Sequence, residues 1–175
     1  HDGFRVDKGG KPTFDRVVKA IEMFHKHDVQ FNTLTVVQSM NAQHPMKVYD
    51  FLKKTGSGFM QFIPLVERLA GDDQKEAGYD HAPPSPPEDH VDESSNVVTR
   101  ETVRPLQFGK FLTTIFDEWV RKDVGEVYVQ HFEEAFGKWV GAPGGLCVFR
   151  ERCGMALVLE SNGDLYSCDH FVYPE

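Results

Sequence analysis

Two short apolar segments enclose a helix-forming segment, and this order constrains the fold more than any other feature. Segments 29–37 (VQFNTLTVV) and 59–64 (FMQFIP) are β-branched or aromatic and carry no charge, which is typical of buried strands. Between them, Pro45 suits the first turn of a helix, and Gly56 and Gly58 end it. Because strand, helix and strand in this order form a βαβ unit, the sequence predicts a parallel sheet with outer helices.

Further segments extend this α/β pattern toward both ends of the chain. A helix is expected from Phe14, with Thr13 as its N-cap, because apolar residues recur there at helical spacing. Residues 105–121 predict a helix with a strongly aromatic face, and residues 132–140 predict another. Residues 127–129 are expected to form a third strand.

The composition changes twice along the chain. Segment 71–104 is acidic and rich in proline, which predicts an exposed loop or insertion. After the glycines near residue 141, two alternating segments flank Asn162-Gly163-Asp164, a pattern typical of a β-hairpin. We therefore expect two units, residues 1–140 with the 71–104 insertion, and residues 141–175.

Charge and hydrophobicity exclude some classes of partner. The net charge of −8 and the pI near 5.5 argue against binding to nucleic acid or to an anionic membrane. No run of about 18 apolar residues occurs, so no membrane-spanning helix is expected. Thiols that are not all paired in disulfides fit a reducing compartment, so we expect a cytoplasmic protein.

The chain has three cysteines, Cys147, Cys153 and Cys168, and all lie near its end. An odd number excludes a closed set of disulfides, and a four-coordinate metal site would need one more ligand. Three hypotheses remain open: buried structural cysteines, zinc completed by His170, or an iron–sulfur cluster completed by a cysteine beyond residue 175. The last hypothesis implies that the chain is part of a longer protein.

The cysteine region resembles a known family. Cys147-x₅-Cys153-Gly, followed by ESNGDLYSCDHFVYP, resembles the start of the SPASM domain in anaerobic sulfatase-maturating enzymes of the radical S-adenosylmethionine (AdoMet) superfamily. The upstream matches, in chain order, are His1-Asp2, Arg5, Gly9-Gly10, the run 13–17, Phe31-Asn32-x-Leu34-x-Val36-Val37, the run 61–64 and Val66-Glu67-Arg68.

This resemblance implies an architecture and an activity. Residues 1–140 would form the C-terminal part of a parallel (β/α) radical-AdoMet barrel, and residues 141–175 the start of a SPASM domain with its hairpin. The family converts a cysteine or serine of a sulfatase into formylglycine without oxygen, using AdoMet and 4Fe-4S clusters. Expected partners are the sulfatase polypeptide and an electron donor such as flavodoxin or ferredoxin.

The resemblance also implies roles for the residues near the hairpin. Cys147, Cys153 and Cys168 match three ligands of the first auxiliary 4Fe-4S cluster. Asp169 matches the proposed acceptor of the proton from the substrate thiol or hydroxyl. The chemistry requires such an acceptor, because the carbon radical loses its electron once the neighbouring sulfur or oxygen is deprotonated. The alternative for Asp169 is a structural hydrogen-bond acceptor at the end of the hairpin.

Two upstream residues match positions that contact AdoMet. Arg5 matches the arginine that binds its carboxylate, for which the planar guanidinium is suited. Val66 matches a backbone position that lines the nucleoside, just after a strand, where parallel sheets hold their sites. The alternatives are a solvated arginine and a plain core valine.

The sequence departs from the family in three respects, because it lacks the radical-forming motif Cys-x₃-Cys-x₂-Cys, the preceding barrel strands and the remaining SPASM cysteines. We therefore expect this chain to be inactive in isolation. Two alternative functions stay open: another SPASM-type peptide maturase, or a non-catalytic module that binds metal through thiolates.

Overall fold

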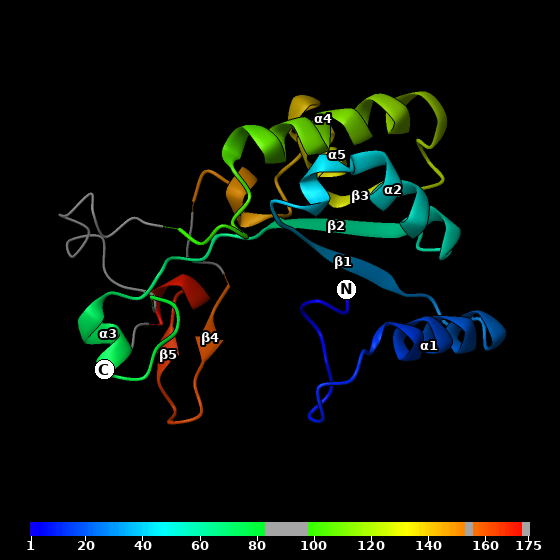
Figure 1. The fold of residues 1–175 in the computed structure, drawn as a ribbon. Helices are drawn as coiled ribbons and strands as arrows, with labels where there is room; N and C mark the ends of the chain where they lie inside the picture. The colour runs from blue at the N-terminus through cyan, green and yellow to red at the C-terminus, as the bar shows by residue number, and fades with distance from the viewer. Residues whose placement is uncertain (83–97, 153–155, 173–175) are drawn as a thin grey trace.

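The computed structural model describes residues 1–82, 98–152 and 156–172 (Figure 1). Its elements are, in chain order, α1 (Phe14–Lys26), β1 (Asn32–Val37), η1 (Asn41–Gln43), α2 (Pro45–Lys54), β2 (Phe59–Pro64), α3 (Asp72–Glu76), α4 (Pro105–Lys122), β3 (Tyr128–Val129), α5 (Gln130–Trp139), η4 (Cys147–Phe149), β4 (Val158–Leu159), β5 (Leu165–Tyr166) and η5 (Asp169–Phe171). Within these ranges, no helix is long and apolar enough to cross a membrane.

The three strands β1, β2 and β3 form one parallel sheet in that order. Asn32 lies opposite Phe59, Val37 lies opposite Pro64, and Phe59 lies opposite Tyr128. Helix α2 connects β1 to β2, and α4 precedes β3, so each parallel step is made through a helix, as βαβ geometry requires. The predicted α/β class with a parallel sheet is confirmed.

The core lies on one face of the sheet, where α2, α4 and α5 pack (Figure 1). Its buried members are Val37, Ala42, Tyr49, Leu52, Met60, Phe62, Val103, Phe111, Ile115, Trp119, Val129 and Phe132. Both strands were expected to be buried, but in the described chain only one face of the sheet is covered. Side chains alternate across a strand, and on the opposite face Leu34 and Ile63 remain 60% and 43% exposed.

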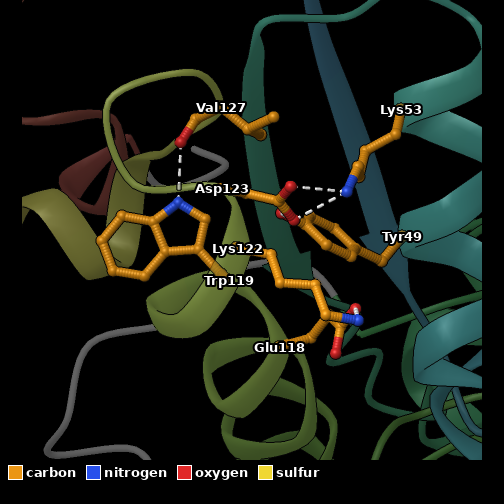
Figure 2. A network of polar contacts seen from close by, with 7 residues as sticks. All are labelled: Tyr49, Lys53, Glu118, Trp119, Lys122, Asp123 and Val127. Atoms are coloured by element: carbon orange, nitrogen blue, oxygen red, sulfur yellow. Dashed lines mark hydrogen bonds and ion pairs between the residues drawn. The ribbon is translucent and has the colours of Figure 1, made fainter.

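A buried polar network ties α2 to the end of α4 (Figure 2). The Asp123 carboxylate accepts hydrogen bonds from the Tyr49 hydroxyl at 2.7 Å and from the Lys53 ammonium at 2.6 Å. Burial alone would raise the pKa of Asp123, but the hydrogen bonds from Lys53 and Tyr49 outweigh it and lower the pKa below its usual value. Next to this network, the Trp119 indole donates to the Val127 carbonyl at 2.7 Å, which fixes the turn that leads into β3.

The N-terminal helix is capped differently from the prediction. Thr13 does precede α1, but its side chain makes no capping hydrogen bond and donates instead to the Arg5 carbonyl at 2.9 Å. The Asp2 carboxylate accepts hydrogen bonds from the backbone of Thr13 and Phe14 at 3.1 and 2.9 Å. A carboxylate at this end also suits the positive end of the helix dipole, so Asp2 takes the role assigned to Thr13.

The predicted loop 71–104 is structured at both ends within the described residues. Helix α3 lies near its start, and Thr99, Thr102 and Val103 near its end are buried. Composition alone missed this order, because it comes from hydrogen bonds between the 98–103 segment and the chain that follows β2. Residues 83–97, the most acidic and proline-rich part, lie outside the described residues.

The C-terminal region contains a short antiparallel pair of strands. Val158 of β4 lies opposite Tyr166 of β5, and Leu159 lies opposite Leu165. The turn between them places Gly163 at a φ of 96°, a conformation that glycine adopts without strain. The strands lie where the alternating pattern predicts them, although each is only two residues long.

Candidate functional site

The first candidate site lies at the carboxyl ends of β1 and β2. After β2, the Leu65 amide donates to the Val37 carbonyl at 2.8 Å, and the Leu65 carbonyl accepts from the Val103 amide at 3.1 Å. Val66 follows and is 66% exposed in the described chain. Among the described residues, its backbone N–H and carbonyl make no hydrogen bond.

Glu67, the next residue, is held by two buried threonines of the 98–103 segment. The Thr102 hydroxyl accepts a hydrogen bond from the Glu67 amide at 3.0 Å and lies 3.2 Å from the Glu67 carbonyl. The Thr99 amide donates to the same carbonyl at 2.9 Å, and the Thr99 hydroxyl donates to the Glu67 carboxylate at 3.2 Å. The chain that flanks Val66 is therefore fixed on both sides.

Arg5 lies in an N-terminal turn that precedes α1. Its amide donates to the His1 carbonyl at 3.0 Å, and an isolated antiparallel bridge pairs Val6 with Pro12. The side chain is exposed, and no ion pair holds the guanidinium within the part of the chain that the structure describes. The backbone of Arg5 is thus fixed while its guanidinium remains available to an anion.

An open pocket of about 500 Å³ connects this turn to the end of β1. Its lining residues are His1, Gly3, Phe4, Gln38, Met40, Asn41, Gln43 and His44. Residues 1–4 therefore lie against the segment that follows β1, at the same edge of the sheet where Val66 follows β2. The structure brings the neighbourhood of Arg5 and the position of Val66 to one edge.

The second candidate site is the cysteine region. Cys147 is exposed at the start of η4, and Cys168 is buried just before η5. Cys153 and the imidazole of His170 lie outside the described residues. The cluster bound by three cysteines and the zinc site completed by His170 therefore both stay predictions. In the ranges that the structure describes, no three His, Cys, Asp or Glu side chains are grouped as a metal site. The chemistry of the donors nevertheless fits a soft metal centre, because thiolates are its preferred ligands.

The loop that carries Cys147 is tied to helix α5. The Gly145 amide donates to the Glu134 carboxylate at 2.7 Å, and the Arg150 guanidinium donates to the Gly144 carbonyl at 2.7 Å. A Cβ at Gly144 would lie 2.9 Å from the Phe149 carbonyl oxygen, so the loop closes only with glycine there. The position of Cys147 therefore depends on polar contacts and close backbone packing.

Asp169 lies directly after Cys168 and is exposed. The Cys168 thiol donates a hydrogen bond to the Asp169 carboxylate, with the sulfur and oxygen 3.1 Å apart. This contact uses the thiol proton, so a deprotonated Cys168 could not make it. The structure thus places a carboxylate beside a sulfur, and both the structural and the chemical interpretation of Asp169 remain predictions.

Sequence reasoning missed the residues that hold Glu67. Thr99 and Thr102 lie in a segment that composition assigns to a loop, and only their spacing of three residues, next to Val103, indicated that one side of the segment packs inward. The Nδ1 of His131 is buried without a hydrogen-bond partner among the described residues, and burial lowers the pKa of its imidazole.

Comparisons with known proteins give matches along the whole chain. No family model matches the sequence. The serine-type anaerobic sulfatase-maturating enzyme of Bacteroides thetaiotaomicron is 39% identical over 175 residues, which is all of this chain and 40% of that protein. The cysteine-type anaerobic sulfatase-maturating enzyme of Clostridium perfringens is 29% identical over 174 residues, 98% of this chain and 41% of that protein. The chain therefore spans about two fifths of the length of these relatives.

The fold matches as well. The solved structure of native anSMEcpe with bound AdoMet and Cp18Cys peptide superposes with a TM-score of 0.74 at 28% identity, over 98% of this chain and 42% of that chain. A second structure, native anSMEcpe with bound AdoMet, gives a TM-score of 0.71 at the same identity and over the same shares of the two chains. Sequence and fold thus agree over the same residues, and the chain is similar over its whole length to about two fifths of the length of the anaerobic sulfatase-maturating enzymes.

Proposed function

We propose that this chain is the part of an anaerobic sulfatase maturase that holds AdoMet and the first auxiliary cluster. The observation that carries this proposal is the match along the whole chain, in sequence to sulfatase-maturating enzymes and in fold to one with bound AdoMet and a peptide. Residues 1–140 would belong to the radical-AdoMet barrel and residues 141–175 to the SPASM domain. The substrate would be a sulfatase polypeptide, whose cysteine or serine becomes formylglycine.

AdoMet would bind at the edge where β1 and β2 end. Arg5 would bind its carboxylate, because the guanidinium is exposed and has no ion pair among the described residues. Val66 would line the nucleoside through its backbone, since its N–H and carbonyl have no partner in the described chain. Together these groups would fix the orientation of AdoMet.

Cys147, Cys153 and Cys168 would hold three irons of a 4Fe-4S cluster, which supplies a one-electron acceptor close to the substrate. The protein's own contribution is to position the thiols. Gly145 and Glu134 fix the loop of Cys147, and the β4–β5 pair brings the chain back to Cys168. The electron donor to the enzyme would be a small reducing protein such as flavodoxin or ferredoxin, and a reducing cytoplasm would suit these thiols.

Asp169 would accept the proton of the substrate thiol or hydroxyl. A carboxylate is competent for this step when it is ionised and lies within hydrogen-bond reach of the substrate. Asp169 directly follows Cys168 in the sequence, and this adjacency supports the role because it places the proton acceptor beside a cluster ligand.

The test is an anaerobic reaction of the complete enzyme with AdoMet, a reductant and two matched sulfatase-motif peptides, one with cysteine and one with serine at the target position. Mass spectrometry should show formylglycine in at least one peptide. A crosslinked or epimerised peptide would instead support another peptide maturase, and unchanged AdoMet with zinc-bound protein would support a non-catalytic thiolate module.

A further inference from the structure

The peptide groups on either side of Val66 are both held by the 98–103 segment. The Leu65 carbonyl accepts from the Val103 amide at 3.1 Å, and the Glu67 amide donates to the Thr102 hydroxyl at 3.0 Å. A trans peptide is planar, with its N–H and carbonyl pointing in opposite directions. Because the Leu65 carbonyl and the Glu67 N–H point toward the 98–103 segment, the Val66 N–H and carbonyl both point away from it.

Thr102 is suited to this task because one hydroxyl serves both backbone groups of Glu67. Its oxygen accepts from the Glu67 N–H and lies within donating distance, 3.2 Å, of the Glu67 carbonyl. The side chain is 7% exposed, so water does not readily replace these contacts. Thr102 is also 35 residues from Glu67 in sequence, which makes this a tertiary contact rather than a local turn.

We infer that Thr102 is a positioning residue for AdoMet, acting through the backbone of Glu67 to aim the Val66 N–H and carbonyl at the nucleoside. This inference rests on the proposed function, which places the nucleoside at Val66. A donor and an acceptor held side by side match the donor and acceptor edge of a nucleobase. Because the backbone is already fixed, less conformational freedom is lost on binding.

The experiment compares T102V, T102S and T113V in the complete enzyme. Valine keeps the shape of threonine without the hydroxyl, and serine keeps the hydroxyl. Thr113 is the matched control, because it is exposed on α4 and, among the described residues, its hydroxyl bonds only within its own helix, to Gly109 and Lys110. Equilibrium binding of AdoMet, kcat at saturating AdoMet, and hydrogen exchange at the Glu67 amide are measured for each.

We expect T102V to weaken AdoMet binding about fivefold and to speed exchange at the Glu67 amide by a similar factor, the usual consequence of removing the acceptor of an amide hydrogen bond. T102S should restore both, T113V should change neither, and kcat at saturation should stay within about twofold for all three because the chemistry is elsewhere.

Two results would overturn the inference. The first is that T102V binds AdoMet as tightly as the wild type although hydrogen exchange at the Glu67 amide is faster. The second is that T102S fails to restore AdoMet binding. Wild-type enzyme that binds no AdoMet at all would instead remove the proposed function, and the inference with it.

Discussion

The sheet unit and the cysteine region are stabilised in different ways. In the sheet unit, α2, α4 and α5 bury a continuous apolar core, with Phe62 and Phe111 both fully buried and packed edge to face at 5.2 Å. In the cysteine region, Leu157, Leu159 and Leu165 are each more than 60% exposed, and order comes from glycine turns and single hydrogen bonds. Burial of apolar side chains can stabilise the sheet unit. The cysteine region needs further interactions, and a cluster bound by its thiols would provide them.

The largest effect should come from the core. Phe111→Ala removes a fully buried ring and should lower the free energy of unfolding by about 4 kcal/mol. Leu159→Ala in the cysteine region, where the side chain is 70% exposed, should change it by less than about 0.5 kcal/mol. Urea unfolding followed by tryptophan fluorescence measures both. Equal losses would show that the two regions do not differ in this way.

A second variant separates chemistry from folding. In the complete enzyme, Asp169→Asn should lower formylglycine formation about 100-fold, because an amide does not accept the substrate proton, while cleavage of AdoMet continues. Both products are measured by mass spectrometry in the same reaction. If the two activities fall together, Asp169 has a structural role.

The Asp123 network predicts a pH dependence for the sheet unit. The pKa of Asp123 is lowered in the fold, so its contribution to stability is present above the ordinary aspartate value near 4 and is lost as pH falls through the lowered value. Asp123→Asn should cost about 2 kcal/mol at pH 7 and should flatten the stability profile below about pH 4. Urea titrations from pH 7 to pH 3 measure this. A profile that stays as steep as that of the wild type would contradict it.

The smallest effect should come from the loop of Cys147. Glu134→Ala removes the acceptor of the Gly145 amide and should destabilise the loop by about 1 kcal/mol, without unfolding the sheet. Hydrogen exchange at Gly145 and the rate of alkylation of Cys147 should both rise. Glu133→Ala on the same helix serves as the control. An unchanged exchange rate would show that Glu134 does not fix this loop.

The sequence predicted the sheet unit well because periodicity and helix-ending residues act locally. Pro45 begins α2 and Pro105 begins α4, at the positions that their fixed φ suits. The register of β1 on β2 and the one-sided burial of both strands could not be predicted, since they depend on which helices cover which face. The role of Asp2 as the cap of α1 was missed for a similar reason, because it reaches Phe14 from 12 residues away.

The site was predictable only in part. Family resemblance supplied Arg5, Val66 and Asp169, and their roles remain predictions. The contacts of Thr102 with Glu67 join segments 35 residues apart, so the sequence around Thr102 does not identify Glu67 as its partner. Composition even pointed the other way, because it assigned Thr102 to an exposed loop.

The most direct measurement is the iron and acid-labile sulfide content of the complete enzyme, purified without oxygen, compared with that of a Cys147/Cys153/Cys168 triple alanine variant. We predict that the variant loses the equivalent of one 4Fe-4S cluster, retains the others, and shows faster hydrogen exchange in residues 141–172 while the sheet unit keeps its protection. Equal iron and sulfide in the two proteins, or zinc in place of iron in the wild type, would contradict the assignment of these thiols to a cluster.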